Sequence, residues 1–229
     1  MRVTRIKAII FDLDGCLVDS ERLVLEAIVD EMKAEGVADA SFEEIRDNFL
    51  GCSLARIKAH VEQRSGRPCA DGFAGRIEGR LRAAYPDHLR RIDGVLPLLQ
   101  DLKDRGIAVG IATGGSVSRM GFTLQHSGLA DWFIDTGFSA EMVQRGKPAP
   151  DIFLLAAEGL GVLPEDCAVM EDSPLGVTGA VTAGMRAVGF VGGGHLDGMR
   201  AAHAQNLQDT GASAVLYSLD GMLEALLDL

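Results

Sequence analysis

The chain has 229 residues and a formal net charge of −11. That length suffices for one sizeable core domain and a smaller second unit. The negative charge, with no basic cluster in the sequence, excludes nucleic acid and anionic membranes as partners because both would repel the chain.

Cysteine and apolar patterns point to a reducing compartment. The four cysteines lie far apart without CxxC spacing, which disfavours both a zinc site and a disulfide framework. The five histidines show no metal-ligand spacing, so we expect them to have surface or packing roles. The chain enters an apolar run almost at once, and no run approaches the ~20 residues of a membrane span. The sequence therefore predicts neither a signal peptide nor a membrane segment, and a cytoplasmic location.

The first predicted strand, residues 6–11, is followed directly by two acidic residues. The strand is apolar apart from Lys7 near its start, which is typical of a strand covered on both faces. Asp12 and Asp14 come next, before Gly15. Aspartate and glycine are also common in plain turns. In an open parallel sheet, however, ligands bind outside the carboxyl ends of the strands, so this position favours chemistry.

Residues 20–87 differ from the rest because they contain no strand pattern. Their apolar spacing predicts successive amphipathic helices, at 21–35, 42–49, 53–65 and 71–85. An inserted group of helices that leaves and rejoins the chain near Asp12 is placed to close over that position and exclude water.

The remaining sequence alternates strands with helices. Strands are expected at 107–112, 132–134, 167–170, 187–191 and 214–216, and a last helix starts at 221. This alternation predicts an α/β fold, with a doubly wound parallel sheet and helices on both faces.

Polar motifs follow two of these strands, and a third lies in the loop before a helix. Thr113 and Gly114 end the strand at 107–112 and leave backbone amides open, which suits a phosphate cradle. Lys147 lies in a loop stiffened by two prolines, just before an apolar helix at 152–157. Glu171 and Asp172 form a second acidic pair after the strand at 167–170.

The ordered set of four motifs resembles the haloacid dehalogenase superfamily, in the branch of beta-phosphoglucomutase-like and phosphosugar phosphatase proteins. This resemblance implies a Rossmann-like catalytic core at 1–19 and 88–229 and a helical cap domain at 20–87. It also implies Mg²⁺ as cofactor, a small phosphate ester as substrate, and a monomer or weak homodimer.

The resemblance assigns a role to each motif. Asp12 is implied to be the nucleophile that forms an aspartyl-phosphate, and Asp14 the general acid and base. Thr113 with Gly114 holds the phosphoryl group, and Lys147 offsets charge. The implied metal site is drawn from the four acidic residues, with Glu171 acting either directly or through water: Asp12, Asp14, Glu171 and Asp172.

Asp14 also discriminates among reactions within the superfamily. Haloacid dehalogenases proper need no acid at this position because halide leaves without a proton. Phosphonate cleavage in related enzymes uses a cap lysine, and the candidates Lys33 and Lys58 fit solvated helix positions better. Phosphate monoester chemistry is therefore favoured.

Substrate choice is expected to depend on the cap. Gly51, Ser53 and Arg56 resemble a cap loop that faces the site in sugar-phosphate relatives, although Arg56 also fits an exposed helix position. A beta-phosphoglucomutase-like mutase must bind a second phosphate, but Val24 and Ser116 replace two of its expected contacts. We therefore expect a phosphatase for a sugar phosphate or a phosphosugar acid such as 6-phosphogluconate. A mutase, a phosphoglycolate phosphatase and a non-catalytic binding module are the alternatives.

Overall fold

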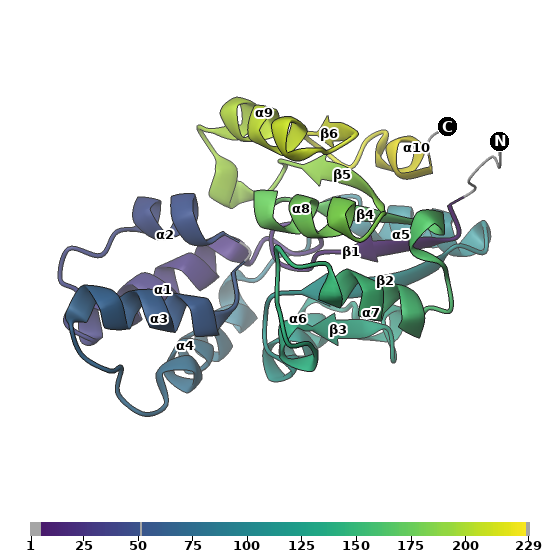
Figure 1. Ribbon diagram of the computed structural model, residues 1–229. Coiled ribbons are helices and arrows are strands. Elements are labelled where there is room, and N and C mark those ends of the chain that lie inside the picture. Colours follow the sequence, from purple (N-terminus) through teal and green to yellow (C-terminus); the bar gives the residue numbers. More distant parts are fainter. Residues whose placement is uncertain (1–5, 51, 228–229) are drawn as a thin grey trace.

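The computed structural model describes residues 6–50 and 52–227. Figure 1 shows a parallel sheet flanked by helices and, beside it, a separate group of helices. The sheet has six strands in the order β3-β2-β1-β4-β5-β6. The strands are β1 (Ala8–Phe11), β2 (Ala108–Thr113), β3 (Gly137–Ser139), β4 (Cys167–Glu171), β5 (Arg186–Phe190) and β6 (Ala214–Leu216).

The strand order makes this a doubly wound sheet. The chain passes from β1 outward through β2 to β3, then returns to place β4 on the other side of β1. All neighbouring strands are parallel. The predicted Rossmann-like α/β fold is confirmed, and the reversal of strand order puts the expected ligand crevice at the carboxyl ends of β1, β2 and β4.

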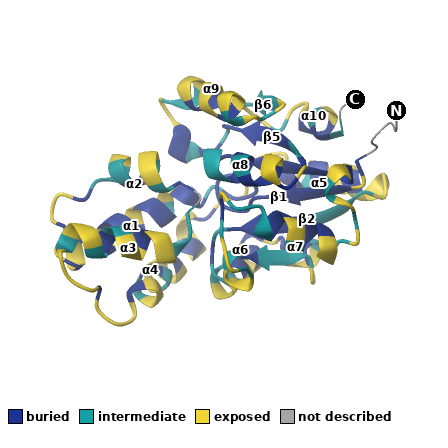
Figure 2. Ribbon diagram, viewed as in Figure 1, coloured by how far each residue is buried: buried dark blue, intermediate teal, exposed yellow. Residues whose placement is uncertain are grey.

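Helices cover both faces of the sheet. On one face α7 (Asp151–Gly159), α8 (Pro174–Thr182) and α9 (Arg200–Thr210) pack side by side, while α5 (Val95–Asp104) packs with α10 (Met222–Leu227) on the other. Helix α6 (Val117–Ser127) packs along β3. Figure 2 shows the central strands as buried, which explains why the β1 sequence is apolar without alternation.

The second group of helices, which we call the helical unit, comprises α1 (Glu21–Ala34), α2 (Phe42–Phe49), α3 (Leu54–Ser65) and α4 (Phe73–His88). The four predicted helices are confirmed. They pack through buried apolar residues, including Leu25, Ile28, Ile57, Ile77 and Leu81. The two chain crossings that connect the unit to the sheet lie together, since the Asp19 amide donates to the Arg90 carbonyl at 2.8 Å.

The expected strand at 132–134 is wrong. Residues Ala130–Trp132 form the short 3-10 helix η1, and the strand β3 begins at Gly137 instead. Ile134 is 66% exposed and Asp135 has a φ of 59°, so the chain turns here before it can pair. A short apolar run at the sheet margin was mistaken for a buried strand.

Three further 3-10 helices connect the elements: η2 (Ala140–Met142), η3 (Pro164–Asp166) and η4 (Gly194–Leu196). Among the helices of residues 6–50 and 52–227, none combines the length and the apolar character that a membrane span requires.

Candidate active site

Three strand ends bring the predicted motifs together. Phe11, the last residue of β1, pairs with Ile111 of β2 on one side and with Met170 of β4 on the other. Asp12 therefore follows between Thr113 and the Glu171-Asp172 pair, and its amide donates to the Met170 carbonyl at 2.9 Å. Residues more than a hundred positions apart in sequence thus meet at one sheet edge.

Lys147 reaches this edge from the loop before α7. Its Nζ lies 2.5 Å from Asp12 Oδ1 and also donates to Glu171 Oε1. The lysine is only 7% exposed. Burial by itself lowers the pKa of Lys147, but the carboxylates of Asp12 and Glu171 outweigh burial and raise it. Lys147 is therefore a permanent cation in the site.

Glu171 is held in place by its neighbours. Its second oxygen, Oε2, accepts hydrogen bonds from the Ser173 amide at 3.1 Å and the Ser173 hydroxyl at 3.0 Å. A Cβ at Gly176 would lie 1.8 Å from Glu171 Oε1, so only glycine leaves room for this carboxylate. Both oxygens of Glu171 are thus engaged by protein donors.

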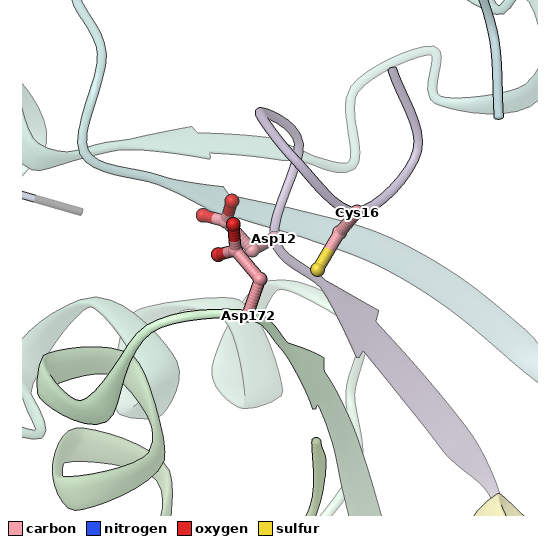
Figure 3. Close-up of side chains that lie close together, drawn as sticks. All are labelled: Asp12, Cys16 and Asp172. Atoms are coloured by element: carbon pink, nitrogen blue, oxygen red, sulfur yellow. The ribbon is translucent and has the colours of Figure 1, made fainter. Parts of the chain in front are cut away.

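Asp12 and Asp172 lie next to each other with excess negative charge. Figure 3 shows the two side chains at the ends of their strands, with the Cys16 thiol nearby. Asp12, Cys16 and Asp172 place one potential ligand atom each within 4.8 Å of one another. Burial raises the pKa of Asp172 and of Asp12, and the surrounding carboxylates raise both further against the opposing effect of Lys147. The negative charge of these carboxylates exceeds the positive charge of Lys147, so a further cation would be stabilised here.

Asp172 has a free coordination position. Among the described residues, its Oδ2 is buried and has no hydrogen-bond partner. His195 Nε2 lies 3.0 Å from this oxygen, but its angle does not give a hydrogen bond. Gly15 has a φ of 82°, and a Cβ there would lie 2.1 Å from Asp172 Oδ2. Glycine is therefore required to keep this oxygen open.

Cys16 does not extend the ligand set. Its thiol points to the Met170 carbonyl at 3.8 Å, and burial raises its pKa, so it keeps its proton. A protonated thiol is a poor ligand for a hard cation. Cys16 therefore packs the turn that follows β1.

The Asp14 carboxylate is held by three neighbouring side chains. Its Oδ1 accepts from the Ser20 hydroxyl at 2.5 Å, and its Oδ2 lies 2.9 Å from Arg119 Nη2 and 3.5 Å from the Thr113 hydroxyl. Thr113 Oγ1 in turn accepts from the Gly115 amide at 3.1 Å. These contacts aim the Asp14 carboxylate at the space between Asp12 and the helical unit.

Sequence reasoning missed Ser20, Glu21, Arg119 and His195 as parts of this site. Arg119 lies in the first turn of α6, directly after the predicted phosphate cradle, and this proximity was the available signal. His195 follows a run of three glycines beyond β5, and we had expected it to be at the surface or in packing. It is 3% exposed and adjoins Asp172.

A small cavity lies over Asp12, between the sheet edge and the helical unit. Its volume is about 30 Å³, which leaves room for only a few waters. One wall is polar and comes from the sheet edge: Asp12, Asp14, Thr113, Gly114 and Arg119. The other wall comes from the helical unit and is mostly apolar: Glu21, Val24, Leu25, Ile28, Phe49, Cys52, Leu54 and Ile57.

None of the three expected cap residues is found among those that line the cavity over Asp12 in the described structure. Gly51 is outside the described residues. Ser53 lines a second groove, which runs from Gly114 along α3 and α4 to the surface. Arg56 is exposed on α3 and does not line the cavity over Asp12. Gly114 lines both spaces, so it lies where the groove and the cavity adjoin.

Comparisons with known proteins agree on one family. The model for haloacid dehalogenase-like hydrolases matches residues 6–184. Hexitol phosphatase A of Escherichia coli is 33% identical over 187 residues, covering 80% of this chain and 82% of the relative. The 6-phosphogluconate phosphatase of the same organism is 28% identical over 194 residues, covering 84% and 86%.

A solved structure extends the agreement to the fold. CbbY from Rhodobacter sphaeroides in complex with phosphate superposes with a TM-score of 0.81, at 26% identity, covering 98% of this chain and 100% of that one. The chain therefore belongs to the haloacid dehalogenase-like hydrolases.

Proposed function

We propose that this hydrolase is a magnesium-dependent phosphatase that cleaves a small phosphate monoester, a sugar phosphate or a phosphosugar acid, through an aspartyl-phosphate on Asp12. The observation that carries the proposal is the position of Asp12. It ends the central strand, is paired with Lys147 at 2.5 Å, and faces a small cavity beside Asp14. The phosphatase names of the relatives described above agree with this reading.

The first half-reaction forms a bond from Asp12 to phosphorus and breaks the ester bond. Lys147 is bound to Oδ1 of Asp12, so Oδ2 is the attacking atom. Asp14 gives a proton to the departing alkoxide, and Thr113 with the Gly114 amide holds the transferred phosphoryl group. Because the small cavity excludes bulk water, the phosphoryl group is not transferred to water before it reaches Asp12.

In the second half-reaction Asp14 takes a proton from water, which attacks phosphorus and releases inorganic phosphate. Asp12 is regenerated as a carboxylate. The hydrogen bond from Ser20 and the ion pair with Arg119 hold Asp14 toward the cavity in both steps. One carboxylate thus serves as acid and then as base.

The residues at the sheet edge fit Mg²⁺. Four carboxylates meet here against the cations of Lys147 and Arg119, and among the described residues Asp172 Oδ2 is buried without a hydrogen-bond partner. Hard oxygen ligands of this kind suit magnesium, which when bound neutralises charge on the phosphoryl oxygens. Asp12, Asp172 and the Asp14 carbonyl would hold it. Because its oxygens are engaged by Lys147 and Ser173, we propose that Glu171 acts indirectly by orienting the lysine.

We propose that the helical unit, residues 20–87, is a cap that opens to admit substrate. The cavity over Asp12 is too small for a sugar phosphate, so the unit must move for substrate to bind. Cap and core hold each other through Glu78, which accepts from the Ser116 hydroxyl, and through Arg82, which donates to the Ser118 hydroxyl at 2.7 Å. Ser53, which lines the groove, would meet substrate on the way in, and Arg56 would do so only with the cap open, while the substrate contact expected of Gly51 lies outside the described residues. We expect the enzyme to work in the cytoplasm, in keeping with its free thiols.

The mutase alternative needs contacts for a second phosphate. Val24 and Leu54 line the cavity where that enzyme is expected to have polar contacts, and Ser116 is engaged with Glu78. These side chains support hydrolysis over transfer between positions.

The test is magnesium-dependent phosphate release from a panel of sugar phosphates, phosphosugar acids and small phosphorylated acids. We expect at least one strong substrate, and turnover that vanishes in Asp12→Asn while circular dichroism shows a folded protein. Asp197→Asn, which removes a carboxylate that is 73% exposed, is the matched control and should keep full activity. Phosphate release by pure Asp12→Asn at the wild-type rate would sink the proposal. Isomerisation of beta-glucose 1-phosphate with a bisphosphate primer, without hydrolysis of the panel, would establish the mutase instead.

A further inference from the structure

Arg119 has more donors than the site uses. Its guanidinium carries five N–H groups, and Nη2 is the group that meets Asp14 Oδ2 at 2.9 Å. Within the part of the chain that the structure describes, Nη1 is buried and has no hydrogen-bond partner of good geometry, and the Tyr85 hydroxyl, which also raises the pKa of Arg119, is the nearby protein group that interacts with the guanidinium. A buried donor without a partner is costly, and each such group in a folded protein calls for an explanation.

The surroundings of Arg119 keep it charged and fixed. Burial alone lowers its pKa, but Asp14, Tyr85 and Glu21 outweigh burial and raise it. The side chain is 11% exposed, and it lies so close to Gly115 that a Cβ there would approach Nη2 to 2.5 Å. The absence of a side chain at Gly115 therefore leaves the space that the guanidinium fills.

The position of Arg119 places it next to the leaving group. It lines the same cavity as Asp12, Thr113 and Gly114, and it touches the carboxylate that would protonate the leaving oxygen. The opposite wall is mostly apolar and contributes the carboxyl group of Glu21, whose pKa is raised to about 8 by burial, so that it keeps its proton at neutral pH. A leaving group in this cavity thus meets Arg119 as its main polar partner outside the phosphate site.

We propose that Arg119 binds a carboxylate of the substrate's leaving group, so that the preferred substrates are phosphorylated carboxylic acids rather than neutral polyol phosphates. The inference rests on the phosphatase function proposed above. The guanidinium fork matches a planar carboxylate with two parallel hydrogen bonds, which uses the free Nη1. A carboxylate adds one negative charge, whereas a second phosphate adds nearly two to a site already crowded with carboxylates. The charge balance therefore favours the acid.

The test compares pairs of substrates that differ only in a carboxylate. One pair is 3-phosphoglycerate and glycerol 3-phosphate, and the other is 6-phosphogluconate and sorbitol 6-phosphate. We expect the wild type to prefer the acid in at least one pair. The pair with the larger preference indicates which spacing between carboxylate and phosphate ester fits the site. Arg119→Gln also removes the ion pair with Asp14, so turnover of both substrates should fall, but kcat/KM for the acid should fall by about 10- to 100-fold more than kcat/KM for the alcohol, the effect of a hydrogen bond to a charged group.

Two variants separate recognition from charge and folding. Arg119→Lys keeps the charge but not the fork, so it should lie between the wild type and Arg119→Gln in its preference for the acid. Arg82→Gln removes an arginine at the rim between cap and core that does not line the cavity, and should leave the preference unchanged. Circular dichroism and the melting temperature of each variant report whether it is folded.

Binding to the inactive Asp12→Asn protein tests the same residue without turnover. Titration calorimetry with Mg²⁺ and each phosphate should show tighter binding of the acid, lost when Arg119→Gln is added. Equal losses for acid and alcohol in folded variants, no preference in either pair, or a preference for fructose 1,6-bisphosphate over every acid would overturn the proposal. Absence of hydrolysis for every phosphate, with the acid still bound more tightly through Arg119, would instead refute the phosphatase function alone.

Discussion

The two walls of the cavity differ in chemistry and in origin. The sheet wall comes from the ends of β1 and β2 and from the first turn of α6, and ion pairs with Arg119 and with Lys147 hold its carboxylates Asp14 and Asp12 in place. The wall from the helical unit combines apolar side chains of α1, α2 and α3 with the carboxyl group of Glu21. The comparison teaches that the charged groups are concentrated on the sheet, so under the proposed function the sheet wall carries the reaction chemistry and the helical wall acts by shape and by excluding water. Changes in the sheet wall should therefore affect turnover, and changes in the helical wall should affect substrate choice.

The largest effect is expected from Gly15→Ala, at the sheet edge next to the sheet wall. The new Cβ meets Asp172 Oδ2 at 2.1 Å, so the carboxylate must move. A displacement of about 1 Å in a catalytic group costs on the order of 100-fold in rate. We expect a loss of that size in kcat at saturating Mg²⁺, together with a weaker magnesium dependence measured by phosphate release.

The matched control for this change is Gly184→Ala. Gly184 has a φ of 79°, close to the 82° of Gly15, but a Cβ there meets nothing within 4 Å. Both variants should lose about 1 kcal/mol of stability from the strained backbone. If Gly184→Ala lost as much activity as Gly15→Ala, backbone strain rather than the position of Asp172 would be responsible.

A smaller effect on turnover is expected from Ile28→Ala in the helical wall. Ile28 is 1% exposed and lines the cavity, so truncation should cost about 2–5 kcal/mol of unfolding free energy. The enlarged cavity should raise KM by about tenfold, with little change in kcat for substrates that still bind. Steady-state kinetics and urea unfolding measure the two effects.

Ile77→Ala provides the comparison within the same helical unit. Ile77 is fully buried on α4 but does not line the cavity. It should lower stability as Ile28→Ala does and leave KM unchanged. A fall in kcat for Ile28→Ala as large as that of Gly15→Ala would mean that the division between the two walls is wrong.

The smallest effect concerns the pH dependence of stability through Glu21. Burial, followed by Asp14 and Asp172, raises the pKa of Glu21 to about 8 from an ordinary value of 4.5. Between these two values the unfolded chain has lost a proton that the folded protein keeps, so stability falls as pH rises through that window. Glu21→Gln removes this titration, and its stability should change less between pH 5 and pH 8 than that of the wild type.

The measurement is urea unfolding at several pH values with a chelator present. Glu26→Gln, on the same helix in an exposed pair with Arg22, should keep the wild-type slope. Parallel curves for wild type and Glu21→Gln would show that Glu21 is ionised in the folded protein.

Local sequence patterns predicted most of the fold. The apolar run of β1 and the amphipathic spacing of the four helices followed directly from the residues. The strand expected at 132–134 failed because its three residues have no partner strand at that position, and pairing with Ile111 falls on Gly137 instead. Strand pairing is a non-local property that a short apolar run does not report.

The candidate site divides in the same way. The sequence by itself determined the motif residues Asp12, Asp14, Thr113, Lys147 and Asp172, since each follows directly from a strand end or a stiff loop. Only the tertiary structure decided that Arg119, Glu21 and His195 join them, because their side chains reach the site across gaps of sequence that no spacing rule covers. Charge compensation and burial depend on which distant groups meet in space, and for this protein those meetings are set by the packing of α1, α6 and η4 around the end of the sheet.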